Sequence, residues 1–156
     1  MQRTIWIVDD DLMVLDVLST MVSSLGYKVR SFSDPKDLLQ QYSNQPPDIV
    51  ITDVRMPRMS GIELTRALIQ KDPRVQVIVL TGFPSVPDVM EALRSGASDY
   101  LSKPTTTGEL HIRIERLLEN RKLQERLKFT RLVATGLVES LPLWLILGML
   151  VAKIFR

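Results

Sequence analysis

The chain has 156 residues, with 45% hydrophobic residues, 24% charged residues and a formal net charge of +2, which suits one ordered domain with a sizeable core and a short appendage. It has no cysteine, so disulfides, thiolate metal sites and a cysteine nucleophile are excluded, and its single histidine, His111, excludes a histidine cluster. The small net charge gives no reason to expect direct nucleic-acid binding.

Short apolar runs alternate with longer segments of helical period along most of the chain. The predicted strands are residues 4–8, 27–31, 49–52, 75–80 and 98–102. The predicted helices are residues 12–25, 35–42, 61–71 and 85–94, and a last helix that starts near residue 107. Five strand-helix units in a row predict an α/β fold, a doubly wound parallel sheet with helices on both faces.

Local signals support these helix boundaries. Asp34 followed by Pro35 is a typical pair of N-cap and first helical residue. Ser60 with Glu63 three residues later has the pattern of a capping box. Gly26 after the first helix suits a C-terminal cap.

The segment from Asp48 to Gly61 places a lone carboxylate, Asp53, directly after a buried apolar strand and before a loop. An acid in this place is held by a rigid scaffold and remains open to solvent. Because ligands of doubly wound sheets bind at the carboxyl ends of the strands, polar residues that follow the other strands are expected at the same edge. These residues are Asp9, Asp10 and Asp11 after the first strand, Thr81 after the fourth and Lys103 after the fifth.

Carboxylates from two strands repel one another unless a cation lies between them. Mg²⁺ is a hard cation that typically binds one or two carboxylates together with waters and a substrate phosphate. Lys103 and Thr81 add a positive charge and a hydroxyl, which suit the oxygens of a phosphoryl group. The residues therefore favour Mg²⁺-dependent phosphoryl transfer with Asp53 as the nucleophile.

In these motifs the chain resembles the receiver domain of bacterial two-component response regulators over roughly residues 1–120, and VRMPRMSG and DYLSKP are nearest to receivers of the nitrogen-regulatory activator type. The resemblance implies a flavodoxin-like fold with five parallel strands in the order 2-1-3-4-5, with Mg²⁺ as cofactor and phosphorylation at Asp53. The residues that it assigns are Asp9, Asp10, Asp53 and the carbonyl of Arg55 as metal ligands, Thr81 and Tyr100 as switch residues, Lys103 as the phosphate contact, and Pro104 after a cis peptide bond.

The same resemblance implies the partners and the mode of signalling. A histidine kinase or a phosphotransfer protein is expected to donate the phosphoryl group, and the chain is expected to catalyse only its own phosphorylation and dephosphorylation. Phosphorylated Asp53 is expected to draw in Thr81, to let Tyr100 turn inward and to change the face made by the fourth helix, the fifth strand and the fifth helix. At Arg58 the family consensus has glycine, and this departure is expected on the surface of a loop, where it leaves the resemblance intact.

Other interpretations of the same residues stay open. Asp11 can be a helix cap, and Tyr100 can be an ordinary half-buried strand residue. A phosphatase of the haloacid dehalogenase type needs a second aspartate where this chain has Arg55, and a flavodoxin needs a phosphate-binding loop where this chain has three acids. The functional alternatives are a receiver-like interaction scaffold that is not phosphorylated and the N-terminal fragment of a longer transcriptional activator. His111 is expected on the surface.

After the receiver-like part, residues 121–156 are predicted as a basic and then hydrophobic helical extension. Residues 110–131 suit one long helix with loosely spaced apolar residues. Its far half either pairs with a second chain to give a homodimer or is a solvated helix with a basic face. From residue 132 to 152 the only charge is Glu139. A segment of this length can cross a bilayer, and the basic residues before it would then stay on the cytoplasmic side.

Three interpretations of residues 132–152 compete. The segment anchors the protein to a membrane, covers a dimer interface or the domain's own switch face, or is the exposed end of a truncated longer regulator. Glu139 and Pro142 weaken a membrane span, because they leave an uninterrupted apolar run of only about a dozen residues. Trp144 weakens it because it lies in the middle of the segment and not at an interface. The sequence thus predicts a cytoplasmic protein, which the first interpretation ties to the inner face of the cell membrane.

Overall fold

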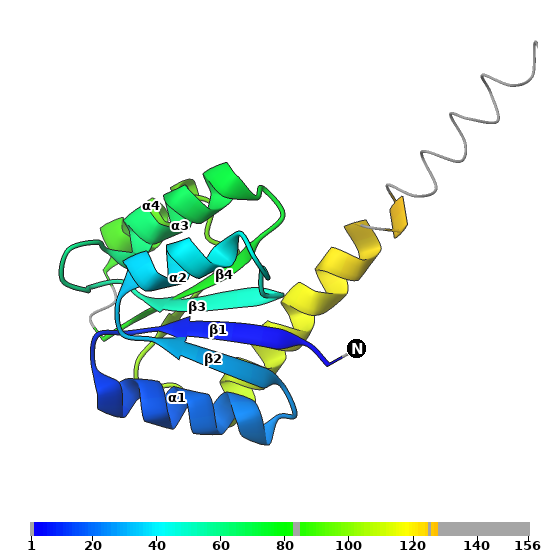
Figure 1. Ribbon diagram of the computed structural model, residues 1–156, viewed down its shortest axis with the longest axis horizontal. Coiled ribbons are helices and arrows are strands. Elements are labelled where there is room, and N and C mark those ends of the chain that lie inside the picture. The colour runs from blue at the N-terminus through cyan, green and yellow to red at the C-terminus, as the bar shows by residue number, and fades with distance from the viewer. Residues whose placement is uncertain (1, 83–84, 125, 128–156) are drawn as a thin grey trace, which may run out of the picture. The chain divides into compact units, whose positions relative to one another are not determined.

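The computed structural model describes residues 2–82, 85–124 and 126–127. Its strands are β1 (Thr4–Val8), β2 (Lys28–Phe32), β3 (Ile49–Asp53), β4 (Gln76–Thr81) and β5 (Asp99–Ser102). Its labelled helices are α1 (Leu12–Ser24), α2 (Pro35–Tyr42), α3 (Gly61–Lys71) and α4 (Val86–Arg94). A further helix, here called the C-terminal helix, is continuous over residues 107–124. Strands and helices alternate in the predicted order (Figure 1).

The five strands form one parallel sheet in the order β2-β1-β3-β4-β5. The central strands β1, β3 and β4 are buried almost throughout, because helices cover both faces and apolar residues are needed on both sides. The edge strand β2 is mostly exposed. The predicted doubly wound, flavodoxin-like sheet is therefore confirmed.

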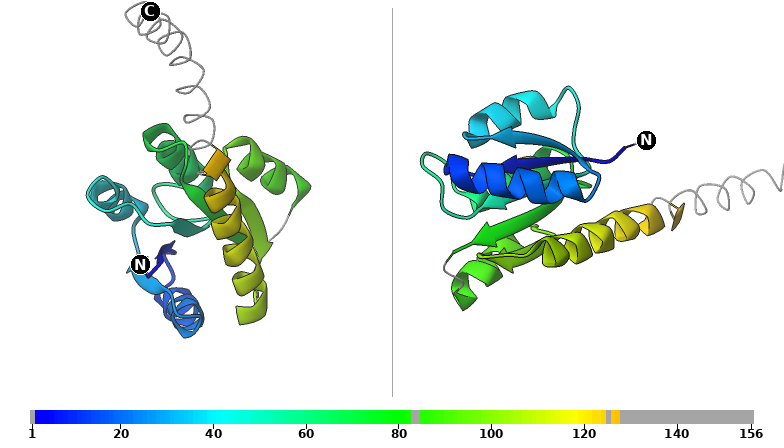
Figure 2. Two further views of the ribbon diagram at one scale, coloured as in Figure 1. Left: turned by 90° about the vertical axis from the view of Figure 1, so that its right-hand side faces the viewer. Right: turned by 90° about the horizontal axis from the view of Figure 1, so that it is seen from below.

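The sheet separates two apolar cores, each covered by its own helices (Figures 1 and 2). On one face α2, α3 and α4 enclose a core that includes Trp6, Leu64 and Ala92. On the other face α1 and the first part of the C-terminal helix enclose a core that includes Leu18 and Ile114. Alternate residues of each strand pack into the two cores, so the strands are held firmly and their carboxyl ends keep fixed positions.

The predicted caps of the helices are present. Asp34 caps α2, with Pro35 as its first residue and the N–H two positions after Asp34 donating to Oδ1 at 2.9 Å. At α3 the capping box is complete: Ser60 Oγ accepts from the Glu63 N–H at 3.2 Å, and Glu63 Oε2 accepts from the Ser60 N–H at 2.7 Å. Gly26, which follows α1, has a φ of 87° that suits glycine.

Two central strands end one residue later than predicted. β3 includes Asp53 and not only Thr52, since Asp53 pairs with Leu80. β4 likewise extends to Thr81, which pairs with Ser102 of β5. Pairing with the neighbouring strand, rather than apolar character, sets the end of each strand, so the two polar residues are part of the sheet itself.

The chain divides into two compact units, Met1–Leu118 and Glu119–Arg156. The sheet and the labelled helices belong to the first unit. Residues 132–152, for which membrane or dimer contacts are predicted, lie outside the described residues. Within the part of the chain that the structure describes, no helix is long and apolar enough to cross a membrane. The division of function at residue 120 stays a prediction.

Candidate functional site

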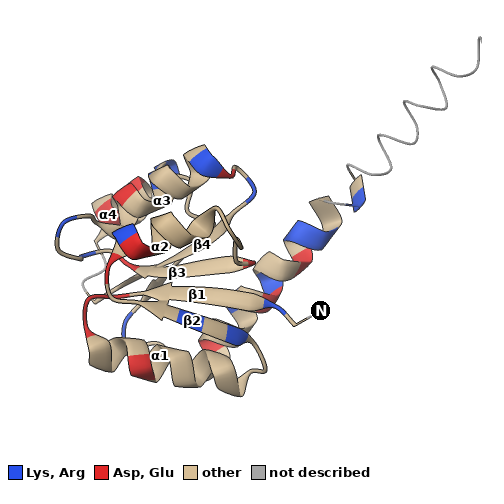
Figure 3. Ribbon diagram, in the orientation of Figure 1, with Lys and Arg blue, Asp and Glu red and all other residues tan. Residues whose placement is uncertain are grey.

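The carboxyl ends of β1, β3, β4 and β5 meet at one edge of the sheet. Val8 pairs with Thr52, the residue before Asp53, and Asp53 pairs with Leu80, the residue before Thr81. Figure 3 shows the loop that leaves β1 at this edge in the colour of Asp and Glu. The polar residues that follow separate strands in the sequence are therefore neighbours in space.

Asp53 is held in one orientation at the end of β3, with 8% of its surface exposed. Its Oδ2 accepts a hydrogen bond from the backbone N–H of Arg55 at 2.6 Å, and its Oδ1 lies 2.5 Å from Nζ of Lys103. The Thr52 hydroxyl donates to the backbone carbonyl of Asp53 at 3.0 Å. A carboxylate fixed by a backbone donor, a cation and its own strand has the preorganisation that a reacting group needs.

Lys103 joins two acids that come from different strands. Its Nζ lies 2.6 Å from Asp9 Oδ2 as well as 2.5 Å from Asp53 Oδ1, and its backbone N–H donates to the carbonyl of Thr81 at 2.6 Å. Burial lowers the pKa of Lys103, but its hydrogen bonds to Asp53 and Asp9 and their negative charges outweigh this effect and raise the pKa overall. The side chain is therefore a cation at neutral pH and compensates both carboxylates. The Lys103–Pro104 peptide bond is cis.

The three consecutive acids after β1 have three different environments. Asp9 is 2% exposed, and its Oδ1 accepts from the N–H of Asp11 at 3.0 Å. Asp11 is exposed and caps α1, accepting from the N–H of Met13 at 2.8 Å. Asp10 is exposed and lines a hollow of about 700 Å³. Asp11 is thus a helix cap, whereas Asp9 and Asp10 face the interior and the open side of the site.

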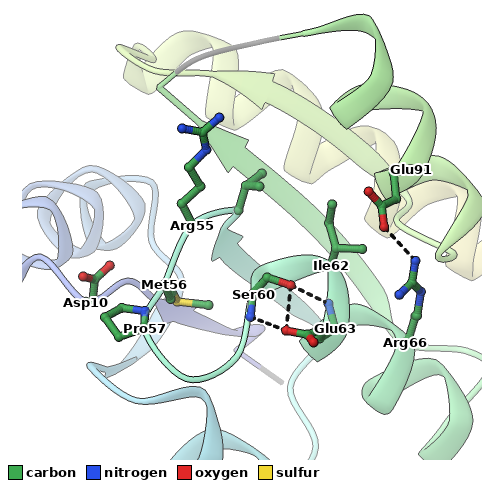
Figure 4. A pocket seen from close by; sticks show the side chains of 10 residues that line it. Asp10, Arg55, Met56, Pro57, Ser60, Ile62, Glu63, Arg66 and Glu91 are labelled. Atoms are coloured by element: carbon green, nitrogen blue, oxygen red, sulfur yellow. Dashed lines mark hydrogen bonds and ion pairs between the residues drawn. The ribbon is translucent and has the colours of Figure 1, made fainter.

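The hollow beside Asp10 lies between the β3–α3 loop, α3 and α4 (Figure 4). Arg55 and Pro57 of the loop line one part of it, and the ion pair between Arg66 Nη2 and Glu91 Oε1, at 2.9 Å, lies at another. A ligand or an ion can therefore reach Asp10 from solvent without moving the sheet.

Thr81 is 2% exposed and Tyr100 is half-buried. The Tyr100 hydroxyl oxygen itself is buried and makes no hydrogen bond of regular geometry within the described ranges. Burial raises the pKa of Tyr100, the nearby Thr81 hydroxyl partly offsets this, and the negative charges of Asp88 and Asp53 raise it further. The Tyr100 hydroxyl is thus buried near Thr81, and a movement of Tyr100 on phosphorylation stays a prediction.

The donor chemistry of the site fits a hard divalent cation, although residues 2–82, 85–124 and 126–127 contain no ready cluster of three or more His, Cys, Asp or Glu side chains. Asp9 and Asp53 both present carboxylate oxygens to one cationic group, the Lys103 ammonium. Asp10 and the carbonyl of Arg55 are further oxygen donors on the adjoining loops. Because Mg²⁺ binds with one or two carboxylates, waters and a phosphate, three clustered carboxylates are not required.

Arg58 lies exposed on the β3–α3 loop, as the sequence predicts. Arg58 adopts a φ of 70°, and its Nη1 lies 2.5 Å from Oδ2 of Asp34, the cap of α2. The hydrogen bond from the Lys36 N–H lowers the pKa of Asp34, burial opposes this, and the charge of Arg58 adds to the lowering. The glycine of the consensus was the signal that could have indicated a positive φ here.

The chain is a flavodoxin-like α/β protein with a doubly wound parallel sheet. Its acids and its lysine lie at the carboxyl ends of the strands, where ligands of such sheets bind. The response regulator receiver domain family matches residues 5–115, which is more than half of the chain. The chain belongs to this family.

The relatives are longer regulators. The chain is 37% identical over 119 residues to the phosphoglycerate transport system transcriptional regulatory protein PgtA of Salmonella typhimurium, a match that covers 76% of this chain and 29% of the relative. It is 32% identical over 127 residues to the DNA-binding transcriptional regulator NtrC of Escherichia coli, with 81% and 27% covered. The chain thus spans less than a third of the length of these relatives, and it is a receiver domain related to theirs.

Among solved structures, the chain resembles a response regulator receiver domain protein from Clostridium thermocellum. The TM-score is 0.74 and the sequence identity is 30%, over 78% of this chain and 98% of the other. The receiver fold is thus shared over nearly the whole of that protein.

Proposed function

We propose that this receiver domain accepts a phosphoryl group on Asp53 in a Mg²⁺-dependent reaction, with a histidine kinase or a phosphotransfer protein as the donor. The observation that carries the proposal is the position of the Lys103 ammonium, 2.5 Å from Asp53 and 2.6 Å from Asp9. A cation is thereby held beside the nucleophile, where charge on the phosphoryl oxygens needs neutralisation. In this role the chain is a signalling domain that catalyses only its own phosphorylation and dephosphorylation.

In the proposed reaction, a carboxylate oxygen of Asp53 attacks the phosphorus of a phosphohistidine. The O–P bond forms as the P–N bond breaks, and the donor imidazole leaves with the electron pair and takes up a proton from solvent. Lys103 and the Thr81 hydroxyl contact the phosphoryl oxygens, and the Arg55 N–H holds the second oxygen of Asp53. Bound Mg²⁺ would supply charge neutralisation at those oxygens. The residues that would hold it are Asp9, Asp10, Asp53 and, through its carbonyl, Arg55.

The proposed signal is a change in the face made by α4, β5 and the C-terminal helix. The Thr81 hydroxyl lies near Tyr100, and contact with a phosphoryl oxygen on Asp53 would draw it away from the tyrosine. Such a shift requires that the phosphoryl group contacts one packing of the face better than the other. α4 suits this movement, because Ala92 is the one buried residue within this helix.

An apolar surface on α1 supports docking of the protein donor next to the site. Leu12, Met13 and Val17 are 69%, 79% and 51% exposed, and a groove of about 540 Å³ runs from Met13 to Lys103 and Pro104. Met13→Glu is expected to slow transfer from a protein donor and to leave labelling by acetyl phosphate unchanged. Equal slowing with both donors would place the docking surface elsewhere.

The decisive test of the proposal is labelling by acetyl phosphate with and without Mg²⁺. The wild-type chain is expected to form an acid-stable, base-labile phosphoprotein only with Mg²⁺, and Asp53→Asn is expected to form none. Asp11→Asn is the matched control, because asparagine still caps a helix and the same charge is lost. Labelling that persists in Asp53→Asn would sink the assignment, and no labelling of wild type would favour the interaction scaffold.

For residues 121–156 we propose a peripheral tether to the cytoplasmic face of a membrane. The support is Arg121 and Lys122 in the C-terminal helix, Arg126 shortly after it, and the apolar run that follows in the sequence. The full chain should sediment with membranes, whereas a chain ended at Asn120 should not. If both stay in the supernatant without detergent, tethering is wrong, and a dimer of the full chain alone in sedimentation analysis would favour pairing through this segment.

A further inference from the structure

Arg58 is the only non-glycine residue with a positive φ in the part of the chain that the structure describes. A φ of 70° belongs to the left-handed region, which side chains with a Cβ adopt rarely and at a cost. Arg58 is 69% exposed, so packing of its own side chain does not hold it there. Another interaction must keep this backbone conformation.

Arg58 forms an ion pair with Asp34. Arg58 Nη1 lies 2.5 Å from Asp34 Oδ2, while Asp34 Oδ1 accepts the Lys36 N–H at 2.9 Å. The carboxylate of Asp34 therefore has two functions, since one oxygen caps α2 and the other binds the β3–α3 loop. Only 20% of the Asp34 side chain is exposed, so its carboxylate keeps a fixed position and can bind the long, flexible side chain of Arg58.

The loop that Arg58 ties down starts at the phosphoacceptor. Its ends are held by the Arg55 N–H on Asp53 Oδ2, at 2.6 Å, and by the Gly61 N–H on the carbonyl of Val54, at 3.0 Å. Arg58 lies between these two points. The loop also carries the Arg55 carbonyl, which is one of the metal ligands in the proposed function.

We propose that Arg58 is a positioning residue: its ion pair with Asp34 holds the β3–α3 loop in the conformation that binds the metal. This inference rests on the proposed function, because it gives the ion pair between Arg58 and Asp34 a role at the same metal site. Arg58 touches neither the phosphoryl group nor the metal, and it acts through the backbone of the loop.

The first experiment measures Mg²⁺ binding to the full chain by calorimetry. Arg58→Ala keeps the loop length and removes the tie, and it is expected to raise the Mg²⁺ Kd by about two- to five-fold, the effect of one partly exposed ion pair. Asp34→Asn keeps the cap and removes the charge, so it should raise the Kd equally, and the double variant should add nothing further. High salt should abolish the difference from wild type.

A matched control separates the tie from a general change of charge. Arg74 is also an exposed arginine in an ion pair, 3.1 Å from Asp72 and 72% exposed, and it precedes β4 at the opposite end of that strand from Thr81. Arg74→Ala is expected to leave the Mg²⁺ Kd unchanged. Arg58→Lys should recover part of the affinity that Arg58→Ala loses.

The second experiment measures amide hydrogen exchange in the β3–α3 loop in the absence of metal. Hydrogen exchange of the Met59 and Gly61 amides should become faster in Arg58→Ala and Asp34→Asn and stay unchanged in Arg74→Ala. A Kd equal to that of wild type in both variants, or unchanged exchange of these amides, would overturn the positioning role. A wild-type chain that binds no Mg²⁺ would overturn the proposed function and the metal step here, and the exchange rates would still show whether Arg58 holds the loop.

Discussion

Gly61 lies so close to the end of β3 that no side chain fits at this position. A Cβ at this position would lie 1.9 Å from the carbonyl oxygen of Asp53 and 2.9 Å from Thr52 Oγ1. Since the nearest atom belongs to the backbone, a change of rotamer cannot relieve the contact, and the end of β3 or the start of α3 must move. The Gly61 N–H, which donates to the Val54 carbonyl at 3.0 Å, would be displaced with it.

The expected loss of stability follows from three contributions. Overpacking against a backbone atom costs about 3 kcal/mol, and the weakened hydrogen bond adds about 1 kcal/mol. Alanine gains about 1 kcal/mol over glycine through helix propensity and a less disordered unfolded chain. Gly61→Ala should therefore lose about 3 kcal/mol, which corresponds to a Tm lower by roughly 10 °C.

Urea and thermal unfolding followed by circular dichroism measure this loss. Gly108→Ala is the matched control, because a Cβ there meets only Thr106 Oγ1 at 4.0 Å, and the change should be neutral or stabilising by about 0.5 kcal/mol. Gly61→Ala should also label more slowly with acetyl phosphate, since the backbone of Asp53 must shift. A Gly61→Ala chain as stable as wild type would refute the reasoning.

Further predictions concern the charges around the site. Lys103→Met leaves Asp9 and Asp53 without the cation that lies between them. Because the lysine is 22% exposed, the free energy of unfolding should fall by about 2 kcal/mol, which is less than the full cost of breaking a buried pair. Mg²⁺ should raise the Tm of this variant more than that of wild type. Asp11→Ala should lose about 1 kcal/mol as a helix cap in urea unfolding and keep acetyl phosphate labelling, whereas Asp10→Ala should weaken labelling. Burial and the interactions with Glu115 raise the pKa of Tyr27 above 10. The neutral tyrosine therefore stabilises the fold below pH 10, and this contribution is lost as the pH rises further. In Tyr27→Phe the free energy of unfolding should fall less steeply above pH 10 than in wild type.

Much of the fold could be predicted because the central strands β1, β3 and β4 are short, largely apolar runs. The errors concern register and helix faces. β2 was predicted at residues 27–31 and lies at Lys28–Phe32, because its pairing with β1 decides where it starts. In α1 the apolar residues Leu12 and Val17 fit the helical period and are 69% and 51% exposed. Periodicity shows that a helix has an apolar face, and only tertiary packing decides which of its residues are covered.

The residues of the candidate site could be predicted from the sequence, but the ion pairs that connect them could not. The ends of parallel strands coincide in space, which is enough to group Asp53, Thr81 and Lys103. The direct contact of Lys103 with both Asp9 and Asp53 could not be predicted, since it depends on distances across 94 residues of sequence. The pairing of Arg58 with Asp34 was missed for the same reason, because neither residue carries a local pattern that points to the other.

The bridge from Lys103 to the two acids also has a consequence for a chain that is still being made. A ribosome that adds about 5–20 residues per second presents Asp53 roughly 3–10 s before Lys103. Until β5 has been synthesised and has paired with β4, Asp53 lacks the Lys103 ammonium that lies 2.5 Å from it in the folded domain. If Asp53 accepts a phosphoryl group as proposed, a nascent chain is expected to do so poorly until β5 has paired with β4.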